Sequence, residues 1–212
     1  ENFFLQIRYL STHGPTVISL HQLTKQLRTG IPLTGEVVIT FDDGYKDNLT
    51  EALPVLRQFN FPATIFVTTG LIGKKDAQDF EMLSEEDIKT LSQSPLITIA
   101  PHTRTHPKLA KLDREQVEQE ESDARRTLEG LTGKTCDLFA YPFGNYSAET
   151  VSVTRDTGFA CAVTVDPGSV GSTDELFTLR RNAIDSATSF VQFKGKLSRV
   201  IDRYESLKHF FI

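Results

Sequence analysis

Two carboxylates stand side by side in the sequence TFDDG at positions 40–44, directly after an apolar run over 37–41. Like charges this close repel each other unless a cation or a proton intervenes. Because successive side chains leave a strand in different directions, Asp42 and Asp43 are not expected to do the same job. The pattern favours one metal-binding carboxylate and one that faces a reacting centre. A solvated turn that simply ends a strand is the alternative.

Two histidines, His102 and His106, lie in the sequence PHTRTHP at 101–107, again directly after an apolar run. At this spacing a helical or turn-like segment brings two imidazoles to one side, which suits a small divalent cation. The pair uses two of the five histidines in the chain. One aspartate with two histidines would leave a coordination position open, as in catalytic rather than structural metal sites.

A third candidate segment, FAYPFG at 139–144, also follows a strand-like run. Pro142 fixes its φ angle and Gly144 permits unusual angles, so this stretch can aim a backbone N–H into a cleft. The rings of Tyr141, Phe143 and Tyr146 are candidate walls of a sugar site. A tight aromatic turn inside the core is the alternative for the same residues.

The elements that must position these residues alternate along the chain between apolar, β-rich runs and helical patterns. Strands are predicted at 16–20, 37–41, 63–68, 96–100, 137–141, 159–165 and 177–183. Helices are predicted at 2–11, 21–28, 47–59, 84–92, 113–131, 147–157 and 189–211. Nearly continuous apolar strands suit a parallel sheet covered on both faces. We expect an α/β fold, a closed or nearly closed barrel of about seven strands, with an open doubly wound sheet as the alternative. In both, chemistry belongs at the carboxyl ends of the strands, where all three segments fall.

The whole-chain composition is that of an ordinary soluble protein. Of 212 residues, 39% are hydrophobic and 24% charged, which excludes wholesale disorder. The net charge of −5 argues against nucleic acid or an anionic membrane as the main partner. No apolar run approaches the ~20 residues that span a bilayer. The chain opens ENFF without a start methionine or signal sequence, so we expect a trimmed N-terminus and treat 1–212 as a single domain.

Two further features carry structural expectations. Cys136 and Cys161 have no metal-type spacing; a disulfide bridge is geometrically possible, and two buried thiols are favoured. The helix predicted over 113–131 is rich in charge, and paired charges at helical spacing favour a solvated outer face there. The charged residues concerned are Glu115, Glu118, Glu120, Glu121, Arg125, Arg126 and Glu129.

The three segments, in this order and at these separations, together with FPATIFV at 61–67, resemble the polysaccharide deacetylase domain of carbohydrate esterase family 4. The resemblance covers essentially the whole chain. It implies a distorted (β/α) barrel with about seven parallel strands and a catalytic cleft at their C-terminal ends. It also implies a hydrolase that removes acetyl groups from N-acetylated or, in some branches, O-acetylated sugars with a divalent metal, commonly zinc.

Residue by residue, the resemblance implies a metal, with Zn²⁺ expected, bound by Asp43, His102 and His106. It implies that Asp42 is the general base and that the metal and the backbone N–H of Phe143 stabilise the tetrahedral oxyanion. The substrate would contact the stretch formed by Tyr141, Pro142 and Phe143.

Two departures from the family pattern stand out. The position of the arginine that orients the base is Ala140 here; Arg180 or Arg181, after the last predicted strand, would replace it, and we favour Arg181. The leucine-x-histidine motif that supplies a general acid is missing, since the segment 177–185 has no histidine. His209 lies in a helix expected over 203–211, too far along the chain to be an easy substitute.

The expected function is therefore removal of N-acetyl groups from an acetylated amino-sugar polymer or oligomer. The alternatives are an O-acetyl esterase or another amidase of the same fold, and a catalytically weak carbohydrate-binding module. By family analogy the partner is a carbohydrate, with a place in exopolysaccharide modification and an extracytoplasmic or cell-envelope location.

Overall fold

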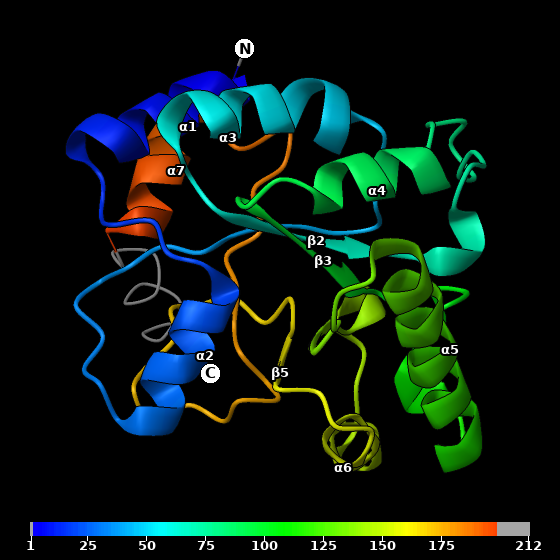
Figure 1. The fold of residues 1–212 in the computed structure, drawn as a ribbon. Coiled ribbons are helices and arrows are strands. Elements are labelled where there is room, and N and C mark those ends of the chain that lie inside the picture. Colours follow the sequence, from blue (N-terminus) through cyan, green and yellow to red (C-terminus); the bar gives the residue numbers. More distant parts are fainter. Residues whose placement is uncertain (1, 199–212) are drawn as a thin grey trace.

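The protein is described by a computed structural model over residues 2–198, in which helices surround a set of parallel strands (Figure 1). The strands are β1 (Ile39–Phe41), β2 (Ala63–Val67), β3 (Ile97–Pro101), β4 (Leu138–Ala140) and β5 (Cys161–Val163). The α-helices are α1 (Asn2–His13), α2 (Leu20–Thr29), α3 (Leu53–Phe59), α4 (Glu85–Ser92), α5 (Arg114–Thr132), α6 (Ala148–Asp156) and α7 (Phe190–Leu197).

The strand ladders are parallel, as the continuous apolar runs predict. One sheet has the order β1-β2-β3, and β4 pairs with β5 in a second. In the first sheet Phe41 is opposite Ile65, and Val67 is opposite Pro101. All five residues of β2 are buried, which is expected of a strand covered on both faces. The α/β class with parallel strands is confirmed.

The closed seven-strand barrel is not confirmed. The predicted strands at 16–20 and 177–183 contribute only single parallel bridges, Val17 to Val37 and Val163 to Leu179. Within residues 2–198 no ladder joins the two sheets, and β1, β4 and β5 have three residues each. A cavity of about 880 Å³ is lined by residues of β1 and of the segment around Leu179, where a closed barrel would pair strands.

Helix ends follow the side chains that cap them. Ser84 and Asp113, where two of the predicted helices begin, each form a capping box, with Asp87 and Gln116 respectively. Helix α5 runs through Gly130 and ends at Thr132, where Gly133 is the C-cap with a φ of 66° that suits glycine. The helix predicted at 189–211 is present as α7; its later part, including the segment 203–211 and His209, lies outside the described residues.

The helices pack on different sides of the strands (Figure 1). Helices α1, α3 and α7 lie together on one side, and α5 and α6 lie side by side on another.

Both cysteines are buried free thiols, as favoured from the sequence. Cys161 accepts a hydrogen bond from the Thr24 hydroxyl at 3.2 Å, and the Cys136 thiol donates to the Ile99 carbonyl at 3.4 Å. Among residues 2–198, no helix is both long and apolar enough to cross a membrane.

Candidate active site

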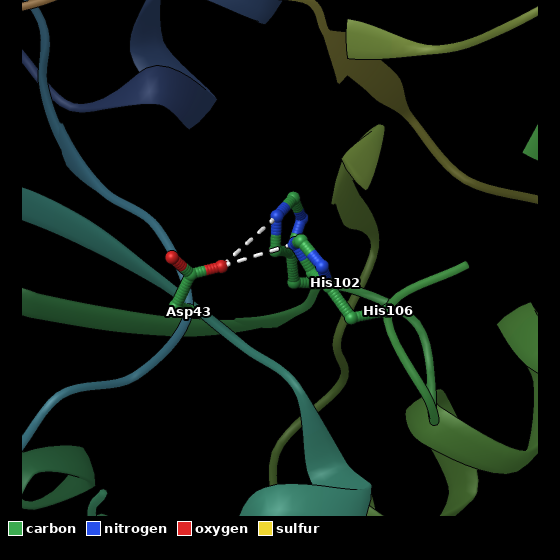
Figure 2. Close-up of side chains that lie close together, drawn as sticks. All are labelled: Asp43, His102 and His106. Atoms are coloured by element: carbon green, nitrogen blue, oxygen red, sulfur yellow. Dashed lines mark ion pairs between the residues drawn. The ribbon is translucent and has the colours of Figure 1, made fainter. Parts of the chain in front are cut away.

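Asp43 and the two histidines meet at the carboxyl ends of β1 and β3 (Figure 2). Oδ1 of Asp43 lies 3.2 Å from Nε2 of His106 and 3.5 Å from Nε2 of His102. One ligand atom from each residue lies within 4.8 Å of the others. The structure thus brings together the three side chains that the sequence proposes as metal ligands.

The ring of His102 is fixed by its second nitrogen. Its Nδ1 lies 2.8 Å from the carbonyl oxygen of Ala140, and because a carbonyl only accepts, Nδ1 carries the proton. The lone pair of Nε2 is therefore free toward Asp43, an arrangement typical of metal-binding histidines. Burial lowers the pKa of His102, which keeps the ring in the neutral form that binds metal.

The loop that carries both histidines has unusual backbone angles. Thr103 and His106 are non-glycine residues at φ 64° and 60°. The Thr103 hydroxyl accepts a hydrogen bond from the N–H of His106 at 3.0 Å, which closes the turn between the two rings. The loop is therefore shaped by local contacts as well as by the strand before it.

The donor set fits a divalent cation. A carboxylate and two neutral imidazoles are ligands that zinc accepts, and three protein ligands leave room for water or substrate. Asp43 is about one-third exposed, which gives the cluster access to solvent. No other group of three such side chains within metal-binding distance exists among residues 2–198.

Asp42 does not join this cluster but pairs with Arg181. The two guanidinium nitrogens Nη1 and Nη2 donate to Oδ1 and Oδ2 of Asp42, both at 2.7 Å. Arg181 also donates to the Thr164 carbonyl at 2.7 Å and to the Thr40 hydroxyl at 3.0 Å, so its head group is fixed. Burial raises the pKa of Asp42, but Arg181 lowers it through hydrogen bonds and charge, and the pKa of Asp42 lies below its ordinary value.

The two candidate arginines have different partners. Arg180 points to Asp174, with Nη2 to Oδ2 at 3.0 Å, and is nearly half exposed. Ala140, the position that the resemblance assigns to the family's arginine, is fully buried in β4. The guanidinium next to Asp42 therefore comes from the end of the chain's last strand-like segment.

A left-handed turn follows β4. Phe143 and Gly144 have φ angles of 58° and 60°. A Cβ at Gly144 would lie 2.3 Å from Cγ2 of Val165, so only glycine fits there. The turn leaves Phe143 57% exposed and places its ring edge-on against the His106 ring, with 4.4 Å between centroids. Phe143 thus lies at the border of the metal-ligand cluster.

The expectation that Tyr141 and Pro142 also contact substrate is not supported, because both side chains are buried. The Tyr141 hydroxyl donates to the Phe177 carbonyl at 3.0 Å, and its ring packs between those of Phe139 and Tyr146. This segment is an aromatic turn of the core from which one ring, that of Phe143, reaches the surface.

The solvated face predicted for α5 is wrong at several of its charged residues, which are buried or contact other segments. Glu121 is fully buried and accepts hydrogen bonds from the hydroxyls of Thr154 at 2.6 Å and Thr157 at 2.9 Å. Glu120 contacts the histidine loop. The helical spacing of Val117, Glu121, Ala124 and Leu128 marks the buried stripe, and this periodicity would have identified Glu121.

Comparison with known proteins agrees with this fold and identifies the family. The model of the polysaccharide deacetylase family matches residues 32–162, and the chain belongs to that family. A relative from Bacillus subtilis (strain 168), named "Putative polysaccharide deacetylase YxkH", is 33% identical over 153 residues, covering 72% of this chain and 53% of the relative.

Two more distant similarities concern named deacetylases and solved structures. The poly-beta-1,6-N-acetyl-D-glucosamine N-deacetylase of Staphylococcus aureus (strain MRSA252) is 24% identical over 166 residues, or 74% of this chain and 57% of the relative. The structure of IcaB from Ammonifex degensii superposes with a TM-score of 0.84 at 26% identity, covering 92% of this chain and 88% of that one. The chain spans about half the length of the curated relatives it matches.

Proposed function

We propose that this chain is a metal-dependent deacetylase that hydrolyses the N-acetyl groups of an amino-sugar polymer. The observation that carries the proposal is the juxtaposition of an Asp–His–His cluster with a second, separately held carboxylate. Asp43 belongs to the cluster, whereas Asp42 forms an ion pair with Arg181. We take residues 1–212 as one catalytic domain of this kind.

Asp43, His102 and His106 would hold a divalent ion, for which zinc is the first choice. When bound, such an ion supplies Lewis-acid polarisation of a carbonyl and lowers the pKa of a water. The neutral state of His102 and the aim of its Nε2 toward Asp43 are the features of this chain that favour the site.

Asp42 acts as the general base. Arg181 keeps it ionised and fixes its orientation, so that it accepts a proton as water attacks the acetyl carbonyl. The backbone N–H of Phe143 donates to the tetrahedral oxyanion. When the carbon–nitrogen bond breaks, Asp42 returns its proton to the leaving nitrogen, giving acetate and a free amine.

The relative named for poly-β-1,6-N-acetylglucosamine suggests that polymer as the first substrate to try. A carbohydrate acted on outside the cell would place the protein in an extracytoplasmic or envelope location. No role with nucleic acid is proposed, in keeping with the net charge of −5.

An O-acetyl esterase is the second candidate. The segment 177–185 places Arg181 beside the base and holds no histidine to act as an acid. An alkoxide is a weaker base than an amine anion, so an ester needs less help from a proton donor.

Acetate release from N-acetylglucosamine oligomers and from O-acetylated sugar oligomers, measured side by side, tests the proposal. We expect faster release from the N-acetylated oligomers, and an Asp42→Asn variant slowed roughly 10²- to 10⁴-fold. Release from the O-acetylated oligomers alone would favour the esterase. Full activity in Asp42→Asn would remove Asp42 as the base.

A further inference from the structure

Glu120 of α5 reaches across to the loop that carries the two histidines. Its Oε2 accepts hydrogen bonds from the backbone N–H of Arg104 at 2.9 Å and of Thr105 at 2.8 Å. Its Oε1 accepts from the Thr105 hydroxyl at 2.7 Å. One carboxylate therefore binds both residues at the centre of the His102–His106 loop.

This loop needs support, because Thr103 and His106 both have positive φ angles. Non-glycine residues stay in such conformations only where the surroundings over-determine them. Hydrogen bonds to an ionised carboxylate are among the stronger ones a loop can make. Glu120 supplies three of them, all within two residues of a histidine.

The opposite side of the loop is held by the short helix η2 (Thr69–Leu71). The N–H of Thr69 donates to the Thr103 carbonyl at 3.2 Å, and that of Gly70 donates to the Arg104 carbonyl at 2.7 Å. A Cβ at Gly70 would lie 2.5 Å from that carbonyl oxygen, so the approach is as close as glycine allows. The loop is thus clamped through its carbonyls by η2 and through its N–H groups by Glu120.

We propose that Glu120 is a positioning residue that presets His102 and His106 for metal binding. It contacts neither imidazole and acts through the backbone between them. The carbonyls of the loop are held whether or not Glu120 is present, whereas the N–H groups of Arg104 and Thr105 depend on it. The inference rests on the metal site of the proposed function and adds a residue to it.

The test is the zinc affinity of the purified chain, measured by competition with a chromogenic chelator. Loss of an outer contact to a metal ligand set costs roughly 10- to 100-fold in affinity, and we expect Glu120→Ala to fall in this range. Glu120→Gln keeps one acceptor oxygen and should lose less. Thr105→Val removes one of the three bonds and should also lose less.

Glu115→Gln is the matched control, because Glu115 is an exposed glutamate on the same helix. Its zinc affinity should equal that of the wild type. The melting temperature of each metal-free variant is measured in parallel to show that it is folded.

A folded Glu120→Ala protein that binds zinc as tightly as the wild type would overturn the inference. A lower melting temperature with unchanged affinity would do the same, since it would make Glu120 a stability contact only. A wild-type chain that binds no zinc would instead overturn the metal site, and with it the proposed function.

Discussion

Arg181 reaches Asp42 from a distant part of the chain. Its guanidinium binds both oxygens of Asp42, while Ala140, the position that the resemblance assigns to the family's arginine, is buried. A planar guanidinium that binds both oxygens of a carboxylate fixes the orientation of that carboxylate and stabilises its negative charge. The ammonium group of lysine does not do both equally well. The orientation of the Asp42 carboxylate is therefore set by the 177–185 segment.

Arg181→Met should lower kcat roughly 10- to 100-fold, which is part of the rate gain that a general base provides. The zinc affinity should stay near the wild-type value. The reason is that Asp42 would lose its orientation and the partner that lowers its pKa. Initial rates of acetate release, with zinc affinity measured separately, check this.

Arg180→Met is the control, since Arg180 pairs with Asp174 at the surface. It should leave kcat unchanged. Equal losses in the two variants would mean that the effect is one of net charge, not of the bond to Asp42.

Gly144→Ala should disturb the turn that carries Phe143. The added Cβ would meet Cγ2 of Val165 at 2.3 Å, at a residue with φ 60°. We expect the free energy of unfolding to fall by about 1–3 kcal/mol and kcat to fall with it. Urea denaturation and acetate release measure the two effects.

Gly130→Ala provides the comparison, because nothing lies within 4 Å of its added Cβ and it sits inside α5. It should be neutral or stabilising by about 1 kcal/mol. If both variants lost the same stability, the close approach of Val165 would not be what requires glycine at 144.

At the scale of the element, α5 joins the site to the core through two adjacent glutamates. Glu120 faces the histidine loop, and Glu121 faces the hydroxyls of Thr154 and Thr157. Burial raises the pKa of Glu121 to about 7, with the nearby charge of Arg125 lowering it and that of Glu118 raising it. The folded state therefore holds this proton more tightly than the unfolded chain, whose ordinary glutamate pKa is near 4.5.

The free energy of unfolding should fall as the pH rises from about 4.5 to about 7, because over this window the folded state binds more protons than the unfolded state. The contribution of Glu121 is at most about 3 kcal/mol, fully present below the window and lost above it. Chemical denaturation at several pH values, compared with Glu121→Gln, isolates it: the glutamine keeps the packing and cannot titrate.

Glu115→Gln, an exposed change on the same helix, should keep the wild-type slope. Wild type and Glu121→Gln with the same pH dependence would contradict the raised pKa of the buried carboxyl.

At the scale of the whole molecule, the sequence predicts well what is local. Asp43, His102 and His106 each follow a strand, and parallel strands bring their carboxyl ends to one edge, so their meeting follows from chain order. Helix starts at Ser84 and Asp113 follow from side chains three residues apart. The choice of Arg181 over Arg180 matches the geometry because alternate residues of an extended segment face opposite sides.

What failed depends on contacts between distant segments. Closure of the barrel requires registry between the 16–20 and 177–183 segments, which no local pattern specifies. An aromatic residue such as Tyr141 suits the wall of a sugar-binding site and a protein core equally. In the structure Tyr141 belongs to the core, where its hydroxyl donates to the Phe177 carbonyl. The charge pattern predicts that Glu120 faces solvent, and its hydrogen-bond partner is a loop elsewhere in the chain that this pattern does not reveal.

Metal binding should be visible in the stability of the whole chain, since the ligands come from two strands and exist together only in the fold. Zinc at about 100 times its dissociation constant stabilises a protein by about 2.7 kcal/mol, or roughly 5–10 °C in melting temperature at this size. Asp43→Asn should abolish the increase, whereas Asp79→Asn, in an exposed loop, should keep it. A zinc-induced increase that survives Asp43→Asn would place the ion elsewhere.

The most direct test of the account is acetate release by chelator-stripped protein from poly-β-1,6-N-acetylglucosamine oligomers as zinc is added back. We expect no release from the stripped chain and full recovery at about one zinc per chain, the stoichiometry of a single three-ligand site. Under the same titration Asp42→Asn should bind zinc without releasing acetate. Release that persists in the stripped protein would contradict metal-dependent catalysis at Asp43, His102 and His106. One bound zinc with no release from any N- or O-acetylated sugar would leave a binding module in its place.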